Sequence, residues 1–372
     1  MKFRFSIVLL LLILFGLWDR EAASAAPATP PLQKTQESAP KGYSSITSHD
    51  EIVSKAKAEA SLNVLARMEP ATIKAMAAAF TKKYPFIKLR LEEITGTDSA
   101  QRSILEIKSG AAKEWDVANL STDFYNQYLP FLWKVDLLRM AQQGVLQIPI
   151  PMIDSKNRNI VGFFSFFHVT AYNRNLLSES QLPRGWHDIL KPDFRGKKFA
   201  NDIRPLGIAG LVPAWGLERT LEYARSMAAQ QPIWVRGGTR TLGAIMRGEI
   251  PMIVGSLFHA TKRSQARDRR SLLQYVLLEP VPVRLALQLG ILSTAEHPHA
   301  ALLWLEWLAS VEAQEIADAY EPLCSSVYVR GGAVEQALRG KELSVVSWEH
   351  HQSIDAWAGK IVEAFGFPKA ER

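Results

Sequence analysis

Strand and helix patterns alternate between residues 62 and 120, and this alternation restricts the fold more than any other feature of the sequence. Short apolar runs typical of strands lie at 62–66, 86–91 and 116–120, and residues 72–84 have the spacing of a helix with one buried face. Strands and helices that alternate in this way form parallel strands joined by right-handed crossovers. The sequence therefore predicts an α/β fold that binds a ligand at the carboxyl ends of its strands.

A second set of elements follows the β-rich stretch 161–172. We expect strands at 198–200 and 250–254, and helices at 217–229 and 239–247. The roughly 320 residues that follow the N-terminal segments also exceed what one hydrophobic core usually holds. Two lobes are therefore predicted.

The lobe boundaries follow from the order of these patterns. We expect residues 51–163 to form the first part of lobe 1 and residues 164–282 to form lobe 2. The chain then returns, and residues 283–372, which are largely helical in pattern, complete lobe 1. Residues 26–50 are rich in Ala, Pro, Ser, Thr and Gln, so we interpret them as a flexible linker that cannot bury a core.

The N-terminus has the three parts of a cleaved secretory signal. Lys2 and Arg4 precede an apolar run at 7–18, and small residues stand at Ala23 and Ala25. At about 1.5 Å per residue this run is too short for a hydrocarbon core of about 30 Å, which argues against the alternative of an uncleaved membrane anchor. We therefore predict a signal peptide at residues 1–25 and a secreted mature protein.

The chain is basic, with a formal net charge of +7. Removal of residues 1–25 takes away three basic and two acidic residues and leaves +6. Such a balance suits nucleic acid, an anionic membrane or an anionic ligand. Export and the scattered charge argue against nucleic acid, and we interpret the basic stretch 262–270 as a solvated face. The single cysteine, Cys324, rules out an internal disulfide, and we expect it to be a buried packing residue in a monomeric protein.

Four tracts, in order along the chain, carry a family resemblance. They are AYNRNLL at 171–177, LPRGWHDILKPDFRGK at 182–197, MRGEIPM at 246–252, and HPHAAL at 297–302 followed by WLASVEAQ at 307–314. The tract at 182–197 is the strongest match. Together they resemble the periplasmic solute-binding proteins of ATP-binding-cassette (ABC) importers, of the type that takes ferric iron, polyamines, thiamine or phosphonates.

The resemblance implies a two-lobed, type II periplasmic-binding-protein fold with two hinge strands between the lobes. It also implies that the protein captures a small solute, closes about its hinge, and delivers the solute to an ABC permease in the inner membrane. No cofactor is implied. A periplasmic receptor that signals to a membrane sensor would have the same fold and stays an alternative.

Candidate ligand-binding residues follow the predicted strands, where helix N-termini offer free N–H groups and partial positive charge. The sequence RGGTRT at 236–241 is the best candidate, because glycine lets the backbone approach an oxyanion and arginine offers a bidentate fork. The alternative for this tract is an ordinary helix cap by its first threonine. The full candidate set is Arg67, Thr97, Ser99, Ser121, Thr122, Tyr172, Arg204, Arg236, Gly238, Thr239 and Arg240.

We expect no metal site. In iron-binding relatives of this type the resemblance implies two adjacent tyrosines after the strand near 250–254, but here Leu257 and Phe258 are followed by a lone His259. A polar or phosphorus-containing organic anion is therefore the favoured ligand, with ferric iron or thiamine as alternatives. A polyamine is a further alternative that rests on Asp98, Asp116, Asp123 and Trp215.

We expect no enzymatic activity. The sequence has no G-x-S-x-G elbow, no H-E-x-x-H and no Walker loop, and the adjacent His350 and His351 cannot share one helix face. A secreted hydrolase that uses scattered serine, histidine and aspartate is the less favoured alternative.

Overall fold

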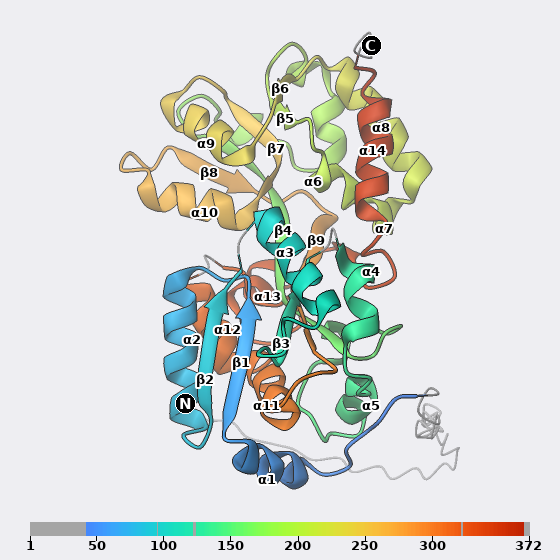
Figure 1. Cartoon of the computed structure of the whole chain (residues 1–372). Helices are drawn as coiled ribbons and strands as arrows, with labels where there is room; N and C mark the ends of the chain where they lie inside the picture. The colour runs from blue at the N-terminus through green and yellow to red at the C-terminus, as the bar shows by residue number, and fades with distance from the viewer. Residues whose placement is uncertain (1–41, 95, 122–123, 321–322, 368–372) are drawn as a thin grey trace, which may run out of the picture. The chain divides into compact units, whose positions relative to one another are not determined.

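The structure is a computed structural model that describes residues 42–94, 96–121, 124–320 and 323–367. The predicted signal peptide and most of the predicted linker lie outside these residues. Within them, one mixed sheet has the strand order β2-β1-β3-β9-β4-β7-β5-β6, with β10 added beside β9 and β8 beside β4 (Figure 1). Helices cover the sheet, which confirms the predicted α/β fold.

Lobe 1 begins with three parallel strands, as predicted. They are β1 (Ser61–Ala66), β2 (Lys88–Glu93) and β3 (Val117–Leu120). The helices of lobe 1 are α1 (His49–Glu59), α2 (Pro70–Lys83), α3 (Gly96–Ser109), α4 (Tyr125–Tyr128) and α5 (Leu137–Gln142), together with α11 (Pro298–Leu308) and α12 (Val311–Tyr320) from later in the chain. Phe80 packs edge-on against Trp304 and Trp307, and these three rings lie in the main apolar core of the lobe.

Lobe 2 has a second parallel set, β5 (Ala200–Asp202), β6 (Ile233–Val235) and β7 (Met252–Leu257). The antiparallel strand β8 (Leu273–Val276) pairs with β4. Its helices are α6 (Leu206–Ala209), α7 (Val212–Trp215), α8 (Leu217–Ala229), α9 (Gly238–Arg247) and α10 (Phe258–Arg267). The predicted strands and helices of this region are confirmed; the bounds of α8 agree, and the ends of the others differ by at most three residues.

Two long strands link the lobes. In β4 (Ile160–Asn173), residues up to Phe167 pair with β9 (Val281–Ile291), and residues from His168 onward pair with β7 and β8. Strand β9 also pairs with β3 of lobe 1. The implied pair of hinge strands is thus β4 and β9.

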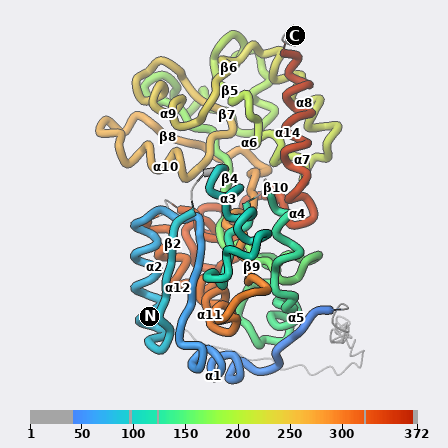
Figure 2. Tube along the Cα trace, viewed as in Figure 1, coloured from blue at the N-terminus to red at the C-terminus, as the bar shows by residue number. Residues whose placement is uncertain are grey.

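The C-terminal segment differs from the expectation that residues 283–372 complete lobe 1. Helix α13 (Ala333–Leu338) and strand β10 (Leu343–Val346) lead to α14 (Ile354–Ala364), which packs on α6 and α8 of lobe 2 (Figures 1 and 2). Ile354 and Ile361 share a core with Trp186 of that lobe. The assignment is wrong for this helix because an apolar helix face shows that it is buried but not which lobe buries it.

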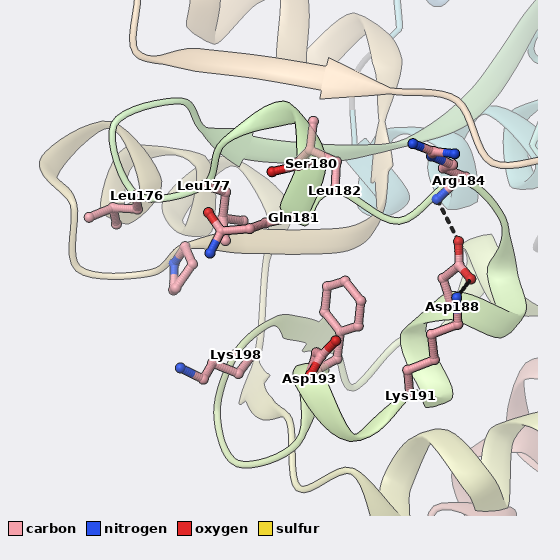
Figure 3. A pocket seen from close by; sticks show the side chains of 12 residues that line it. Leu176, Leu177, Ser180, Gln181, Leu182, Arg184, Asp188, Lys191, Asp193 and Lys198 are labelled. Atoms are coloured by element: carbon pink, nitrogen blue, oxygen red, sulfur yellow. Dashed lines mark hydrogen bonds and ion pairs between the residues drawn. The ribbon is translucent and has the colours of Figure 1, made fainter.

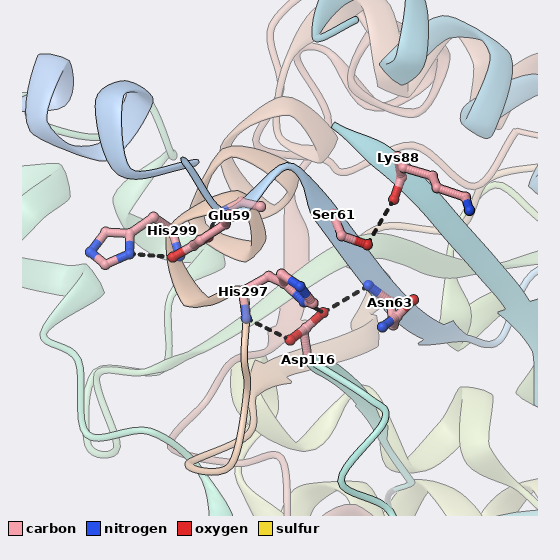
Figure 4. Close-up of polar contacts among 8 residues, drawn as sticks. Glu59, Ser61, Asn63, Lys88, Asp116, His297 and His299 are labelled. Atoms are coloured by element: carbon pink, nitrogen blue, oxygen red, sulfur yellow. Dashed lines mark hydrogen bonds and ion pairs between the residues drawn. The ribbon is translucent and has the colours of Figure 1, made fainter. Parts of the chain in front are cut away.

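Polar contacts fix the start of α11 to β1, to the residue before β3 and to the end of α1 (Figure 4). The Asp116 carboxylate accepts hydrogen bonds from the backbone N–H groups of Asn63 and His297, at 2.8 and 2.9 Å, and contacts the His297 ring at 3.0 Å. Glu59 accepts in the same way from the N–H groups of His299 and Ala300. Negative charge at a helix N-terminus is stabilising, so these carboxylates act as distant caps.

We expect Asp116→Ala to lower the free energy of unfolding by about 2 kcal/mol, because two buried N–H groups lose their acceptor. Urea unfolding followed by circular dichroism would measure the loss. Asp50→Ala, in the exposed first turn of α1, is the control. A loss no larger than that of the control would contradict the capping role.

Among the described residues, every helix is too short or too polar to cross a lipid bilayer. Cys324 is buried, as predicted.

Candidate ligand-binding site

The carboxyl ends of five parallel strands lead into two neighbouring pockets. In lobe 1, Arg67 follows β1 and Ser121 follows β3. In lobe 2, the residues after β5, β6 and β7 line the second pocket or both. Ligands of parallel α/β sheets bind at this position, because each strand there continues into a loop or a helix N-terminus.

The first pocket, here called the hinge pocket, has a volume of about 290 Å³. It lies on the hinge strands and takes residues from both lobes. Its apolar wall includes Phe164, Phe166 and Leu257. Its polar lining is Arg67, Asn119, Ser121, His259, Arg284 and Gln288.

Arg284 is the most unusual of these side chains. It projects from β9 opposite Phe166, and its guanidinium lies 5.2 Å from the centre of that ring. Its Nε is buried without a hydrogen-bond partner, and within the described residues no carboxylate forms an ion pair with it. Burial lowers the pKa of Arg284; Asp355 of α14 raises it and the positive charge of Arg67 lowers it further. A desolvated cation without a counter-ion is costly unless a ligand supplies the negative charge.

Two more polar atoms of the hinge pocket are buried without partners. They are Oδ1 of Asn119, a residue that is 7% exposed, and Nδ1 of His259. The His259 ring lies 4.6 Å from that of Phe166. Burial, with smaller contributions from Arg263 and Arg284, lowers the pKa of His259 to about 4. The imidazole is therefore neutral at neutral pH.

The second pocket, here called the arginine pocket, has a volume of about 480 Å³ and lies in lobe 2. Arg204, Arg236 and Arg240 line it. Its one carboxylate, Asp202, accepts hydrogen bonds from the backbone N–H groups of Gly237 and Arg204, at 3.2 and 2.9 Å. Positive charge therefore exceeds negative charge in this pocket by two.

The N-terminus of α9 forms one side of the arginine pocket. Gly237 is the N-cap residue, with a φ of +96° that favours glycine, and no side chain caps this end. The alternative of a cap by Thr239 is thus not seen. Gly238, Thr239 and Arg240 open the helix, so their first-turn N–H groups face the pocket end of the helix.

His168 forms part of the opposite wall. It is 5% exposed, its Nδ1 lies 2.9 Å from the carbonyl oxygen of Gly255, and its Nε2 has no partner. Burial lowers the pKa of His168 to about 4. Gly207 lies so close that an added Cβ would be 3.0 Å from this ring and from the Gly255 backbone, so the wall is tightly packed.

The structure groups most of the candidate residues and separates a few. Arg67 and Ser121 lie in the hinge pocket, and Arg204, Arg236, Gly238, Thr239 and Arg240 lie in the arginine pocket. Ser99 lines a different hollow beside Arg90 and Glu106, and Tyr172 packs in the lobe 2 core. Thr122 and the side chain of Thr97 lie outside the described residues.

Sequence reasoning missed Asn119, His168, Arg284 and Gln288. A signal was present for Arg284 and Gln288, because a charged and an amide side chain interrupt the apolar run at 281–291. His168 similarly interrupts an aromatic run. Polar residues within long buried strands are candidate ligand contacts, since buried polar groups need partners.

A larger hollow, of about 660 Å³, lies on the surface of lobe 2 and is lined by the tract that carries the strongest family resemblance (Figure 3). Its lining has three basic and two acidic side chains, and Asp188 accepts a hydrogen bond from the backbone N–H of Arg184 and pairs with Lys191. Trp186 of the same tract is buried and donates to the carbonyl oxygens of Leu278 and Pro280. This tract therefore organises the lobe, and nothing in it marks a ligand.

No group of three or more His, Cys, Asp or Glu residues in the described part of the chain could hold a metal ion. At the end of β7, Phe258 is buried, and Leu257 lines both pockets.

Two lobes linked by a pair of strands, with basic pockets at the strand ends, define a two-lobed solute-binding protein. Residues 67–315 match the family of bacterial extracellular solute-binding proteins, and the chain belongs to this family. Its members bind small solutes for ABC permeases and are not enzymes.

Individual relatives agree with this assignment. The Fe(3+)-binding periplasmic protein of Serratia marcescens is 23% identical over 257 residues, which is 66% of this chain and 72% of that protein. Ferric-ion-binding protein A of Pasteurella haemolytica in its apo form has a TM-score of 0.60 at 18% identity, with 84% of this chain and 100% of that chain covered. The Bordetella ferric binding protein gives 0.65 at 16% identity, with 83% and 100% covered. At these identities the structures establish a shared fold.

Proposed function

We propose that this protein captures a small anionic solute in the periplasm and delivers it to an ABC permease of the inner membrane. The observation that carries the proposal is Arg284, a largely enclosed guanidinium without an ion pair in the described chain. It lies on a hinge strand, in a pocket to which both lobes contribute.

The chemistry of the two pockets favours oxyanions. The hinge pocket has two guanidinium groups and no carboxylate among its lining residues. Guanidinium binds carboxylate, phosphate or phosphonate through two parallel hydrogen bonds, which gives geometric selectivity as well as energy. A ligand oxyanion would supply the charge that Arg284 lacks.

The position of the site couples binding to closure. Ligand contacts come from lobe 1 through Arg67 and Ser121, from lobe 2 through His259, and from the hinge strand through Arg284. A ligand that touches all three favours the closed arrangement over the open one by the difference in its affinity for the two. The permease would then receive a closed, loaded protein.

A ferric chelate is the second candidate. The relatives named above bind ferric iron, and a Trichodesmium protein, similar at a TM-score of 0.61 and 21% identity over 83% of this chain and 100% of that chain, holds iron and citrate ligands. Bare Fe³⁺ does not suit the hinge pocket, because Arg67 and Arg284 repel a cation. An iron–carboxylate complex with net negative charge would present oxyanions to the same arginines.

A polyamine or thiamine is less well supported, because both are cationic. Of the carboxylates that favoured a polyamine, Asp116 is engaged with Asn63 and His297, and Asp123 lies outside the described residues. Trp215 packs against Trp186 and Tyr223.

Thermal unfolding of the secreted chain, stripped of ligand, against a panel of solutes tests the proposal. The panel contains phosphate, methylphosphonate, glycerol 3-phosphate, citrate, ferric citrate, ferric iron alone, thiamine and spermidine. A ligand at 100 times its Kd adds about 2.7 kcal/mol to the stability of the folded state, so the midpoint should rise by a few degrees. We expect shifts with anions alone.

Each other outcome has a definite meaning. A shift with ferric citrate, but with neither citrate nor ferric iron alone, would favour the chelate. A shift with iron alone, spermidine or thiamine would contradict anion capture.

A further inference from the structure

The hinge pocket and the arginine pocket are two parts of one continuous surface. Leu257 lines both of them. Phe164 and Phe166 of β4 line the hinge pocket, and His168 of the same strand lines the arginine pocket. Alternate residues of a strand lie on one face, so these three side chains form a row that runs from one pocket into the other.

Both ends of this row carry excess positive charge. Arg67 and Arg284 lie at one end with no carboxylate. Three arginines lie at the other with Asp202, whose oxygens accept from backbone N–H groups. A single anionic group at either end leaves the charge at the other unneutralised.

Each end also has a second sign of a missing ligand. Asn119 in the hinge pocket and His168 in the arginine pocket are both more than nine-tenths buried, and each has a polar atom without a partner. At the arginine pocket this coincides with the uncapped N-terminus of α9, a helix of 10 residues. Buried polar groups in folded proteins are normally satisfied, so both ends are built to receive a polar partner.

The strand geometry sets the length of such a ligand. Arg284 is the register partner of Phe166, and His168 lies two residues further along β4. At about 3.3 Å per residue, the positions of Phe166 and His168 lie about 7 Å apart along β4. Between them the surface is formed by the apolar side chain of Leu257.

Resting on the anion-binding function above, we propose that the solute is an elongated dianion. One anionic group binds Arg284 and Arg67, the other binds the first turn of α9 with Arg240, and an apolar or neutral middle segment lies on Leu257. The ligand class is therefore an α,ω-diacid, in which carboxylate or phosphonate groups terminate a chain long enough to reach both pockets.

Isothermal titration of two homologous series tests the proposal. The first series is malonate, glutarate, pimelate and azelate, and the second is the ω-phosphonocarboxylates of the same chain lengths. Monocarboxylates of equal carbon number are the controls for apolar burial. We expect affinity in at least one series to rise from the shortest diacid to pimelate or azelate, and to exceed that of the matched monoacid at least tenfold.

Single substitutions test which arginine binds each end of the ligand. Arg284→Met and Arg240→Ala should each weaken binding of the long diacid at least tenfold, whereas binding of the shortest should respond to one of the two variants alone. Arg225→Ala removes an exposed arginine of α8 that lines neither pocket and should leave binding unchanged. Circular dichroism and the thermal midpoint of each ligand-free variant establish that it folds.

The outcomes separate this proposal from the broader function. The dianion would be overturned if long diacids bound no more tightly than monoacids, or if their binding did not depend on Arg240. Anion capture would still stand in that case, provided that monoacids bound in a way that depends on Arg284. Failure of every anion in both series would overturn the dianion, and anion capture itself would fall only if the anions of the thermal-unfolding panel also failed to bind.

Discussion

Arg284→Met is expected to stabilise the ligand-free protein while it removes most of the affinity for anions. In the absence of ligand, the buried Nε of Arg284 has no partner, and loss of that group should raise the free energy of unfolding by about 1–3 kcal/mol. Methionine keeps an unbranched stem to fill the space beside Phe166. Loss of a buried charge partner should cost about 2–5 kcal/mol of binding, on the order of 30- to 5000-fold in Kd.

Urea unfolding without ligand and titration with the best solute of the panel would measure the two effects. Arg284→Lys is the matched control: it keeps the charge but not the bidentate fork, so it should bind with intermediate affinity and gain no stability. Asp355→Asn tests whether Asp355 acts as a structural counter-ion, since the charge of this carboxylate raises the pKa of Arg284.

A double-mutant cycle makes that test decisive. If Asp355→Asn destabilises the wild type but not Arg284→Met, the guanidinium is part of the resting structure. A loss of stability in Arg284→Met itself would contradict the prediction in the same way.

Stability should also fall steeply between pH 6.5 and pH 4. Burial lowers the pKa of His168 to about 4, from 6.5 in the unfolded chain. Between pH 6.5 and pH 4 this histidine binds a proton in the unfolded chain but not in the folded chain. Its contribution to the free energy of unfolding is therefore fully present above pH 6.5 and is lost as the pH falls towards 4. The loss is about 1.4 kcal/mol per pH unit, and about 3 kcal/mol over the window.

His259 acts in the same direction, because its pKa is also lowered to about 4, chiefly by burial. Burial likewise lowers the pKa of His351. Urea unfolding from pH 7.5 to 4.5 would measure the combined slope, in a range above most carboxylate titration.

Variants isolate the contribution of His168. His168→Gln should reduce the slope of unfolding free energy against pH by the contribution of one histidine. His187→Gln, at an exposed position, should leave this slope unchanged. An unaltered slope in His168→Gln would show that His168 accepts its proton within the folded state.

Much of the fold could be predicted from the sequence because the information is local. The apolar runs at 62–66 and 116–120, with a helical spacing of apolar residues between them, are examples. The period of the apolar residues shows which side chains face inward, and so distinguishes strands from helices. The same holds for the second parallel set in lobe 2. The placement of α14 could not be predicted, because its apolar face suits either lobe and the choice depends on contacts with α6 and α8.

The candidate site divides in the same way. The tract at 236–241 could be identified because glycines and arginines at a helix start are a local pattern, and Arg67 because it follows a strand. Tyr172 follows a similar rule but lies in the core, since position near a strand end does not fix the face to which a side chain points.

Local patterns in the sequence predict the α/β class, the parallel strands of lobe 1 and the arginine-rich start of α9, because each depends on neighbours along the chain. The tertiary arrangement leaves buried polar atoms of Arg284, Asn119 and His168 without hydrogen-bond partners, and no local pattern predicts this. Pairing of β9 with β3 and with β4 brings these residues together from three distant segments. Burial and the absence of a partner are properties of that assembly, and no residue carries them in isolation.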